Sequence, residues 1–558
     1  MKTRRVRLMT AMLLFVATAL MMAEAGGGGA AQARARAGQA PAHPGLVRYR
    51  LGAHARGVME KVSNIYNTSI VSSDRNVYKA EYEAGFIQGK LQKPQIVAAR
   101  DNGWDSAYLL DPKHAYPKQI PPSAAEIAEA QRTLAANWDY TLDYINTTDD
   151  AEVAKDLRRL MYRLVGIYHG ATLWHPRALP FNAHWEPVFS DAELALGYET
   201  ASLTFMDLYW VNAYQDVLYM LPETAAPSEI ADGRPSKCSA FVLKTADDIY
   251  LTHNNWNSFL DQSQALSLWI AGDFITVNIG APGYLCSDVD FGYTNKGIMF
   301  NETTHRWAHT EAKADALWMF WRAALAEQFS TSIDEFFRFM SLEASGTYMN
   351  GYMVADARTG QIGYIEMSYD AFVFYKPDGK STVTVTTKPV GLRTDYDTEL
   401  VTPTYVLGIN YPASLLIRDE LQSVDNRPAR RVQFMAQIGG VHDIASSKAL
   451  ITYIDPANPL SIYGRWDLGY GITPAPKTIP DGACDAKAVS ASMVRYAARL
   501  KGVLDTGAGT RAFWMKFGTP SVNGQPFVWS ASQWSDQKLR YVPDRVEGDW
   551  RLLHLHMR

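Results

Sequence analysis

The sequence predicts an α+β protein that folds as a layered sandwich. Stretches with strand-like alternation lie on both sides of helical stretches, and strands followed by helices and then strands are typical of layered α+β folds. The 558-residue chain is 47% hydrophobic and 12% aromatic, which favours large packed cores over disorder. Its formal net charge of −4 at pH 7 gives no electrostatic case for binding nucleic acid.

The first 25 residues have the features of a secretory signal peptide. An apolar run covers residues 8–22, and residues 23–25 fit a small-x-small cleavage site. The run follows four basic residues: Lys2, Arg4, Arg5 and Arg7. Because it is too short to span a bilayer comfortably, a membrane anchor is the weaker interpretation. Residues 26–45 are rich in Gly, Ala and Arg and are expected to form a flexible linker. We therefore expect a secreted or lysosomal lumenal protein.

Residues 46–237 are expected to be mostly helical. They open with alternating, β-branched residues over 58–77, which predict a pair of strands. Glu81–Leu91 then follows helical spacing, with glycines where two helices can approach closely. Ser123 is the expected N-cap of the next helix, and Glu126 completes a capping box. Helical periodicity continues over three stretches: residues 123–144, 151–169 and 190–214.

Residues 238–558 have a more β-rich pattern, and we expect them to form one globule with residues 46–237. Strands are predicted within 238–257, 267–279, 291–300, 352–355, 362–367 and 372–375, and helices over 311–329 and 332–342. The segment 222–237, rich in Pro, Ser, Gly and charge, directly precedes Cys238. A flexible linker in that position is suited to cleavage.

The chain has three cysteines, an odd number for an oxidising compartment. If Cys286 and Cys484 pair, Cys238 is left as a free thiol. Two buried thiols are an equal alternative, and the sequence does not choose between the two.

Three N-x-[ST] sequons are present in the chain. Asn67 and Asn146 lie in polar surroundings and are expected to carry glycans. Asn301 lies inside a motif described below and is expected to escape modification.

Cys238 is the candidate nucleophile. The predicted hairpin places it near His253 and Trp256, and a thiol beside a basic group is a candidate for nucleophilic catalysis. A lone cysteine is more often a small buried hydrophobe, but the cleavable segment before Cys238 favours the catalytic interpretation. In an N-terminal nucleophile hydrolase this thiol would attack the carbonyl of Lys237. The freed α-amine, with a pKa of about 7.7–8.0, would then act as base.

A series of motifs in chain order resembles the phospholipase B-like family, which includes the lamina ancestor protein. They are Cys238–Ala240, His253–Ser258, Glu302–Thr304, Ser345–Asn350, Gly464–Leu468, Asp481–Lys487 and Pro526–Ser530. The resemblance covers essentially the whole mature chain. It implies a four-layer αββα sandwich of the N-terminal nucleophile hydrolase type and maturation into two associated chains. It also implies that Cys238 is both the autocleavage and the catalytic nucleophile.

The resemblance extends to five further site residues. His253 and Trp256 match the pocket-lining positions, and Thr303, Asn350 and Arg465 are the nearest matches for the remaining polar site. We assign Asn350 to the oxyanion hole, because an amide N–H donates well to developing negative charge. Arg465 would orient a carboxylate or phosphate or support the nucleophile. Thr303 could equally satisfy a buried backbone group.

Two other pairs of residues are weaker candidates for a site. Asp288 and Asp290 could do acid–base work, but a short solvated acidic turn is the favoured interpretation. His305 and His309 have a spacing able to bind metal on a helix, but no third ligand follows, so a capping or surface role is favoured. The sequence has no Gly-x-Ser-x-Gly elbow and no Gly-rich phosphate loop. No metal or other cofactor is expected.

The sequence thus predicts a hydrolase that cleaves itself between Lys237 and Cys238. It would then cleave an acyl ester or amide bond of a lipid through a Cys238 thioester. One alternative is an amidase acting on N-acylated small molecules or lipids. Another is a lumenal lipid- or glycan-binding protein whose cleavage is only maturation. The expected partners are a lipid or N-acyl substrate, with at most transient contact with a membrane surface, and the oligomeric state is not predicted.

Overall fold

The structure is a computed structural model that describes most of residues 46–558. The residues outside the description are 1–45, 109–121, 199, 221–237, 258–263, 271–274, 307–311, 370, 389–392, 426–427, 456–460, 465–481, 499–509, 519–525, 533–534, 536–537, 539–542, 547 and 556–558. The expected signal peptide, Lys237, His309 and Arg465 therefore lie outside the described residues. Within the described part, no helix is both long and apolar enough to cross a membrane.

The larger sheet has eleven strands in the order β1-β2-β3-β7-β8-β9-β10-β11-β12-β13-β14. Their bounds are β1 Val47–Leu51, β2 Ala55–Val62, β3 Ile65–Ser72, β7 Gln264–Ile270, β8 Ile275–Gly280, β9 Phe291–Thr294, β10 Ile298–Arg306, β11 Met349–Asp356, β12 Gln361–Met367, β13 Phe372–Pro377 and β14 Val383–Lys388. The strand pair expected over residues 58–77 is confirmed as β2–β3, although the chain is already helical from Val77. β3 runs parallel to β7, so segments before and after Cys238 share this sheet.

The smaller sheet has six strands in the order β15-β4-β5-β17-β18-β21. Their bounds are β15 Tyr405–Gly408, β4 Ser239–Lys244, β5 Ile249–Asn254, β17 Asp485–Ser490, β18 Thr510–Phe517 and β21 Arg551–Leu555. The predicted hairpin after Cys238 is confirmed, with Ala240 opposite His253. Asn301 of β10 donates from Nδ2 to the carbonyl of Thr252 in β5 (2.7 Å), which joins the two sheets. The described residues also contain two short ladders: β6 Trp256–Asn257 with β16 Gly482–Ala483, and β19 Phe527–Val528 with β20 Arg545–Val546.

Six helices form an aromatic-rich core with one face of the larger sheet. They are α2 Val77–Tyr108, α3 Ala124–Thr147, α4 Ala151–Thr172, α5 Phe205–Met220, α6 Met319–Phe329 and α7 Ile333–Met340. The expected capping box of Ser123 and Glu126 is present at the start of α3. The close helix approach expected from the glycines is also confirmed. A Cβ on Gly85 would lie 2.2 Å from the Arg163 carbonyl oxygen, and one on Gly89 would lie 2.1 Å from that of Ile167.

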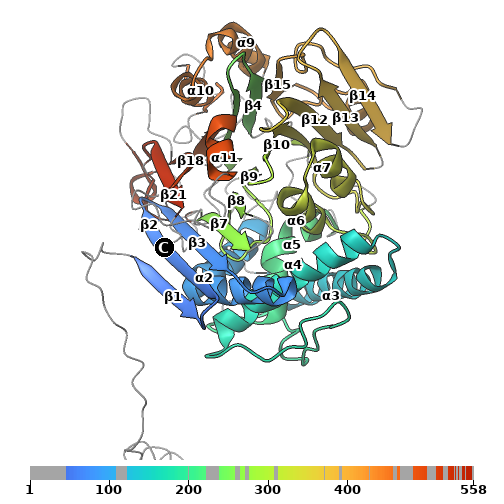
Figure 1. Cartoon of the computed structure of the whole chain (residues 1–558), viewed down its shortest axis with the longest axis vertical. Coiled ribbons are helices and arrows are strands. Elements are labelled where there is room, and N and C mark those ends of the chain that lie inside the picture. Colours follow the sequence, from blue (N-terminus) through green and yellow to red (C-terminus); the bar gives the residue numbers. More distant parts are fainter. Residues whose placement is uncertain are drawn as a thin grey trace, which may run out of the picture. The chain divides into compact units, whose positions relative to one another are not determined.

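Helices also cover the smaller sheet, which gives the four layers (Figure 1). They include α9 Pro428–Gln437, α10 Ile444–Ile451 and α11 Ala491–Ala498. The same part of the chain contains α8 Leu415–Leu421 and the 3₁₀ turns η2 Ile438–Gly440 and η4 Trp529–Ala531. Phe434 of α9 packs against Phe241 of β4 (ring centroids 6.1 Å apart), and α10 packs on β5 and β17. The order is helices, larger sheet, smaller sheet, helices. The expected αββα sandwich is therefore confirmed.

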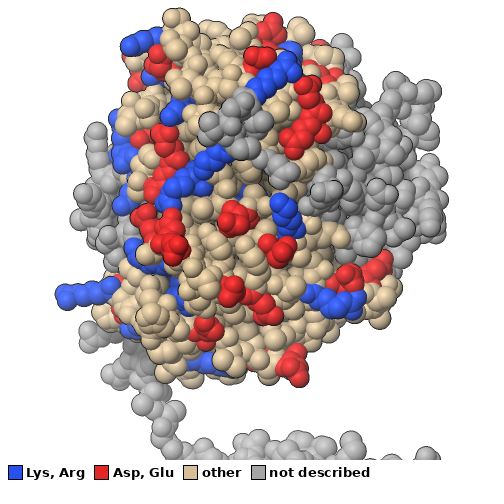
Figure 2. All heavy atoms as spheres, turned by 90° about the vertical axis from the view of Figure 1, so that its right-hand side faces the viewer, with Lys and Arg blue, Asp and Glu red and all other residues tan. Residues whose placement is uncertain are grey.

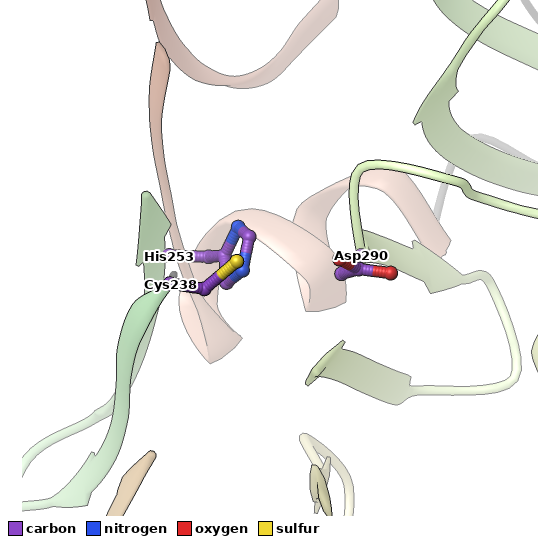
Figure 3. Close-up of side chains that lie close together, drawn as sticks. All are labelled: Cys238, His253 and Asp290. Carbon is purple, nitrogen blue, oxygen red and sulfur yellow. The ribbon is translucent and has the colours of Figure 1, made fainter. Parts of the chain in front are cut away.

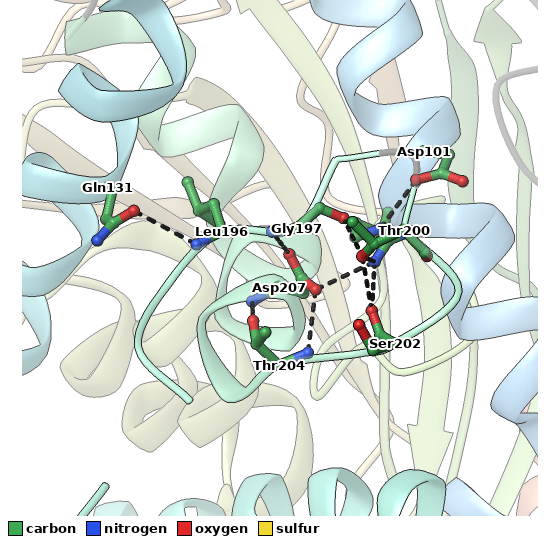
Figure 4. Close-up of polar contacts among 9 residues, drawn as sticks. Asp101, Gln131, Leu196, Gly197, Thr200, Ser202, Thr204 and Asp207 are labelled. Atoms are coloured by element: carbon green, nitrogen blue, oxygen red, sulfur yellow. Dashed lines mark hydrogen bonds and ion pairs between the residues drawn. The ribbon is translucent and has the colours of Figure 1, made fainter. Parts of the chain in front are cut away.

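The helix expected over residues 190–214 is wrong in its first half, because α5 begins only at Phe205. The preceding loop folds around a buried ion pair between Arg100 and Asp207 (3.1 Å). Asp207 accepts hydrogen bonds from the main-chain N–H groups of Gly197 and Thr204, and the Arg100 guanidinium donates to the carbonyl of Thr200 (Figure 4). These bonds occupy main-chain groups that a helix would have paired internally.

The helix expected over residues 311–329 is also shorter than predicted, because α6 begins at Met319. The carboxylate of Asp216 accepts hydrogen bonds from the main-chain N–H groups of Met319 (2.9 Å) and Phe320 (3.4 Å). A carboxylate at this position satisfies the first free N–H groups of a helix and fixes where it starts. The capping residue is about a hundred positions away in the sequence, so local periodicity could not reveal it.

Charges of both signs alternate over the face of the molecule drawn in Figure 2. Acidic and basic side chains lie next to one another there, and no large area of that face carries a single sign. Such a face does not steer a polyanion by long-range attraction, in keeping with the net charge of −4.

Candidate active site

Cys238 lies directly before β4 and is buried. Its Sγ–H points to Oδ1 of Asn255 (3.4 Å). The next residue, Ser239, donates its main-chain N–H to Oδ1 of Asn254, which in turn donates to the carbonyls of Ile451 and Ile462. Asn254 therefore fixes the end of the hairpin to the chain around it, and Asn255 contacts the thiol.

Arg430 of α9 holds the main chain of the candidate nucleophile. Its buried guanidinium donates to the carbonyl oxygens of Cys238 and Ile409 and to Oδ1 of Asn410. A charged donor in a protein interior makes strong hydrogen bonds. This residue was not found from the sequence, because it lies almost two hundred positions after Cys238 in an unremarkable basic helix.

His253 stands beside the thiol (Figure 3). Its side chain is fully buried, and neither ring nitrogen makes a hydrogen bond within the described structure. Burial, and secondly the positive charge of Lys487, hold the pKa of His253 well below its ordinary value, whereas the nearby carbonyl of Glu302 opposes this shift. The imidazole is therefore neutral at physiological pH and keeps a lone pair available.

Asp290, directly before β9, completes a cluster with these two side chains. One ligand atom from each of Cys238, His253 and Asp290 lies within 4.8 Å of the other two. The main chain of Asp290 is in the left-handed region (φ 61°), which is rare for a residue with a side chain and is found at functional sites. The expectation of a solvated acidic turn is wrong, because Asp290 is buried and its neighbour Asp288 accepts a hydrogen bond from the main-chain N–H of Ala281 (2.7 Å).

The carboxyl group of Asp290 interacts with that of Glu302. Burial raises the pKa of Asp290 to about 8. Burial and the neighbouring Asp290 raise the pKa of Glu302 well above its ordinary value. Two adjacent buried carboxyl groups resist losing both protons. At least one of the two carboxyl groups therefore stays protonated near neutral pH, close to the thiol of Cys238.

The thiol of Cys238 is not a ready thiolate in the intact chain. Burial, followed by the nearby carboxyl of Asp290, raises its pKa to about 12, although the main-chain N–H of Trp256 and the charge of Lys487 act in the opposite direction. Because the thiolate is the reactive form, the site needs a base to remove the proton at the moment of attack.

An ion pair beneath the site supports Asn255. Lys487 and Asp485 of β17 are both buried, with Nζ 2.5 Å from Oδ1. The same carboxylate oxygen accepts a hydrogen bond from the main-chain N–H of Asn255 (2.9 Å). The motif Asp481–Lys487 therefore supplies residues that position the partner of the thiol.

Comparison with known proteins identifies the family. A family model described as Phospholipase B matches residues 65–412. The chain belongs to this family. Its curated relatives include phospholipase B-like protein A from Dictyostelium discoideum, 25% identical over 354 residues, which cover 58% of this chain and 58% of the relative. Another is phospholipase B-like 1 from Rattus norvegicus, 25% identical over 285 residues, which cover 46% of this chain and 51% of the relative. The chain thus spans somewhat more than half the length of these relatives.

Among solved structures, the chain is similar to a variant of conjugated bile acid hydrolase from Clostridium perfringens. The sequence identity is 12% and the TM-score is 0.26, with 45% of this chain and 86% of that chain covered. The order of the four layers in this protein follows from its own contacts between sheets and helices.

Trp256 packs tightly beside the candidate site. Its ring is buried, and a Cβ added to Gly464 would lie 1.8 Å from it. The glycine of the Gly464–Leu468 motif therefore makes room for this indole. Arg465, the next residue, lies outside the described part of the chain.

Thr303 and Asn350 lie on the neighbouring strands β10 and β11. Asn350 is opposite Thr304 in the ladder, so the side chains of Thr303 and Asn350 leave opposite faces of the sheet. The hydroxyl of Thr303 and both amide atoms of Asn350 are buried and have no hydrogen-bond partner within the described residues. Buried polar groups normally have a partner, and because these two side chains lie on opposite faces of the sheet, one partner does not serve both.

The cysteines other than Cys238 are buried thiols. All three cysteines are thiols outside any disulfide, so of the two alternatives left by the sequence, the Cys286–Cys484 disulfide is not formed. Cys484 contacts the carbonyl of Asn255 through its main-chain N–H (2.8 Å) and its Sγ (3.4 Å). It therefore supports the same residue that contacts Cys238.

His305 does not have the surface role expected from its sequence. It lies on strand β10, buried, with Nε2 3.2 Å from the hydroxyl of Tyr364 and 3.4 Å from a carboxyl oxygen of Glu366. Burial lowers the pKa of His305 to about 3. It is a neutral core histidine.

The two glycan predictions differ in their structural setting. Asn67 is buried in β3, and its Nδ2 donates to Oε1 of Glu60 and to the carbonyl of His554. The fold therefore withholds the nitrogen to which a glycan would be attached, contrary to our expectation. Asn146 is exposed near the end of α3 and stays a prediction.

Proposed function

We propose that this protein is a self-processing acyl hydrolase of the secretory or lysosomal lumen, with Cys238 as its nucleophile. One observation carries the proposal. The thiol of Cys238 stands at the head of a strand within 4.8 Å of a ligand atom from His253 and one from Asp290, while Arg430 holds its carbonyl. Membership of the phospholipase B family supports a hydrolase.

In the first step, Sγ of Cys238 attacks the carbonyl carbon of Lys237. The C–N bond between the two residues breaks, a thioester forms, and the α-amine of Cys238 is released with the thiol proton. Water then hydrolyses the thioester, which leaves the Lys237 carboxylate and restores the thiol. Neutral His253, beside the thiol, is the group suited to carry the proton during this step.

In later turnovers the freed α-amine of Cys238 serves as the base. His253 is a weak base, because its pKa is held well below the ordinary value, whereas an α-amine titrates at about 7.7–8.0. The thiolate attacks the acyl carbonyl, the alcohol or amine leaves with the proton, and water releases the fatty acid. In this proposal Asn350 donates to the developing oxyanion and Arg465 orients an anionic head group. Thr303 lies on the other face of the sheet and has no direct part in this step.

The substrate class we propose is an acylated lipid, with phospholipid esters as the first candidates. The relatives are named phospholipase B-like, and the same thioester chemistry cleaves both esters and amides. N-acyl amides are therefore a second substrate class to be tested, and their cleavage would follow the same mechanism.

The test compares the purified full chain with Cys238→Ala on phospholipid vesicles and on a panel of N-acyl amides. Cys286→Ser, which removes another buried thiol, is the matched control. Fatty acid release should fall at least about 1,000-fold in Cys238→Ala and persist in Cys286→Ser. A Cys238→Ala protein as active as the wild type would overturn the proposal. A matured wild type that releases nothing on either panel would instead favour a lipid- or glycan-binding protein.

A further inference from the structure

We propose that Cys238, His253 and Asp290 form an inhibitory zinc site that blocks the nucleophile. The three side chains come from separate segments: the residue before β4, strand β5 and the residue before β9. Their candidate ligand atoms all lie within 4.8 Å of one another, and all three residues are buried. The site would therefore join the smaller sheet to the larger one.

The donor set suits zinc. Zn²⁺ binds thiolate sulfur, imidazole nitrogen and carboxylate oxygen, with bonds of about 2.3, 2.0–2.1 and 2.0–2.2 Å. In a tetrahedral site these bond lengths place neighbouring ligand atoms about 3.3–3.7 Å apart. Side-chain adjustments of about 1 Å would bring the three atoms from their present spacing to that geometry. Calcium and magnesium are disfavoured, because they prefer all-oxygen ligands.

His253 supplies an independent reason to expect a ligand. Its side chain is completely buried, yet neither ring nitrogen makes a hydrogen bond to another described residue. A buried imidazole normally has at least one partner. One nitrogen can bind the metal while the other turns to the carbonyl of Glu302, which already faces the ring. A main-chain carbonyl is a common outer partner of a metal-binding histidine.

The charges of the site also fit a divalent cation. A Cys238 thiolate and an Asp290 carboxylate would balance the two positive charges of zinc, and the carboxyl of Glu302 stands next to Asp290. The nearby ammonium of Lys487 is already paired with Asp485. Zinc bound to Sγ would occupy the lone pair needed for attack, so the metal acts as an inhibitor and not as a cofactor.

The direct test uses the full chain, stripped of metal, with zinc chloride or cobalt chloride as the only added ligand. Zinc should bind in one tight equivalent in competition with a chromophoric chelator. Cobalt should give a thiolate-to-metal charge-transfer band together with the visible bands of a tetrahedral ion. A wild-type protein without tight zinc binding and without the thiolate band would overturn the proposal, whether or not the protein is a hydrolase.

Matched variants assign the ligands. Cys238→Ser should abolish the charge-transfer band, and Asp290→Asn should weaken zinc binding at least about 10-fold. Cys286→Ser and Asp288→Asn, which change another buried thiol and the neighbouring carboxyl, should keep both signals. Circular dichroism checks that each variant is folded. A band that survives Cys238→Ser, or wild-type affinity in a folded Asp290→Asn protein, would place the metal elsewhere and contradict the proposed site.

Discussion

Two clusters of buried ionisable groups in this fold differ in how well their members are paired. Between α2 and α4, both carboxylate oxygens of Glu81 accept hydrogen bonds from guanidinium groups, one from Arg159 (Nε 3.1 Å) and the other from Arg163 (Nε 2.8 Å). Near the start of β4, the side chains of His253 and Glu302 are equally buried. Within the described residues, neither ring nitrogen of His253 and neither carboxyl oxygen of Glu302 has a hydrogen-bond partner at normal hydrogen-bonding geometry.

The difference separates a structural cluster from a chemical one. Buried charges that meet their opposite charge keep helices in register and leave nothing over for a ligand. Buried polar groups without partners cost free energy, and they are retained where a reaction or a ligand uses them. The helix cluster therefore supports the fold, and the cluster around Cys238 is the candidate site.

The largest expected effect is a difference in unfolding free energy when a glutamate of each cluster is replaced by glutamine. Glu81→Gln should destabilise the protein by about 3–5 kcal/mol, because it removes the countercharge of buried Arg163 and one of the two carboxylates paired with buried Arg159. Glu302→Gln should change the free energy of unfolding by less than about 1 kcal/mol, because the raised pKa keeps this carboxyl protonated and amide-like. Urea unfolding at neutral pH measures both. Equal losses in the two variants would remove the distinction.

A smaller effect is expected where the helices of the structural cluster touch. Gly85→Ala should destabilise by about 1–3 kcal/mol, because the new Cβ would lie 2.2 Å from a main-chain oxygen of α4. Gly103→Ala on the same helix is the matched control, since its Cβ would come no closer than 3.4 Å to Trp210. The control should be neutral or stabilising. Thermal unfolding of the pair gives the answer, and a Gly85→Ala protein as stable as the control would contradict the close helix contact.

A third expected effect is a change in how stability depends on pH. Burial raises the pKa of Asp290 from 3.8 to about 8 in the folded chain. The stability from this group is therefore complete below the unfolded pKa and is lost as pH rises through the folded pKa. Asp290→Asn removes this loss, so its melting temperature should rise relative to the wild type between about pH 5 and 8. Parallel curves for the two proteins would show that Asp290 is not a buried proton carrier.

The sequence predicted local features well. The hairpin from Cys238 to His253 and the capping box at Ser123 depend on residues close together in the chain, and the glycine spacing around Gly85 predicted a close helix contact without naming the partner helix. Short-range spacing and turn chemistry are sufficient for such features. The αββα layering was implied by the family resemblance, and the contacts of the sheets and helices confirm it.

The parts that were missed depend on residues far apart in the chain. Arg430 was not identified, and Asp290 was named as a possible acid–base residue but interpreted as part of a solvated turn. Both acquire their roles only when two sheets and a helix meet. Similarly, the loop before α5 forms hydrogen bonds to the buried Arg100–Asp207 pair. It therefore does not form the helix that its sequence periodicity predicted. In these places contacts between distant parts of the chain, and not the local sequence, determine the structure.

The most direct test of the central claim is the N-terminal sequence and mass of the purified protein. If Cys238 cuts its own chain, a fragment that begins at Cys238 should be present and should stay associated with the preceding fragment, and Cys238→Ser should slow its appearance. An intact chain, or a chain cut only at other positions, would contradict self-processing.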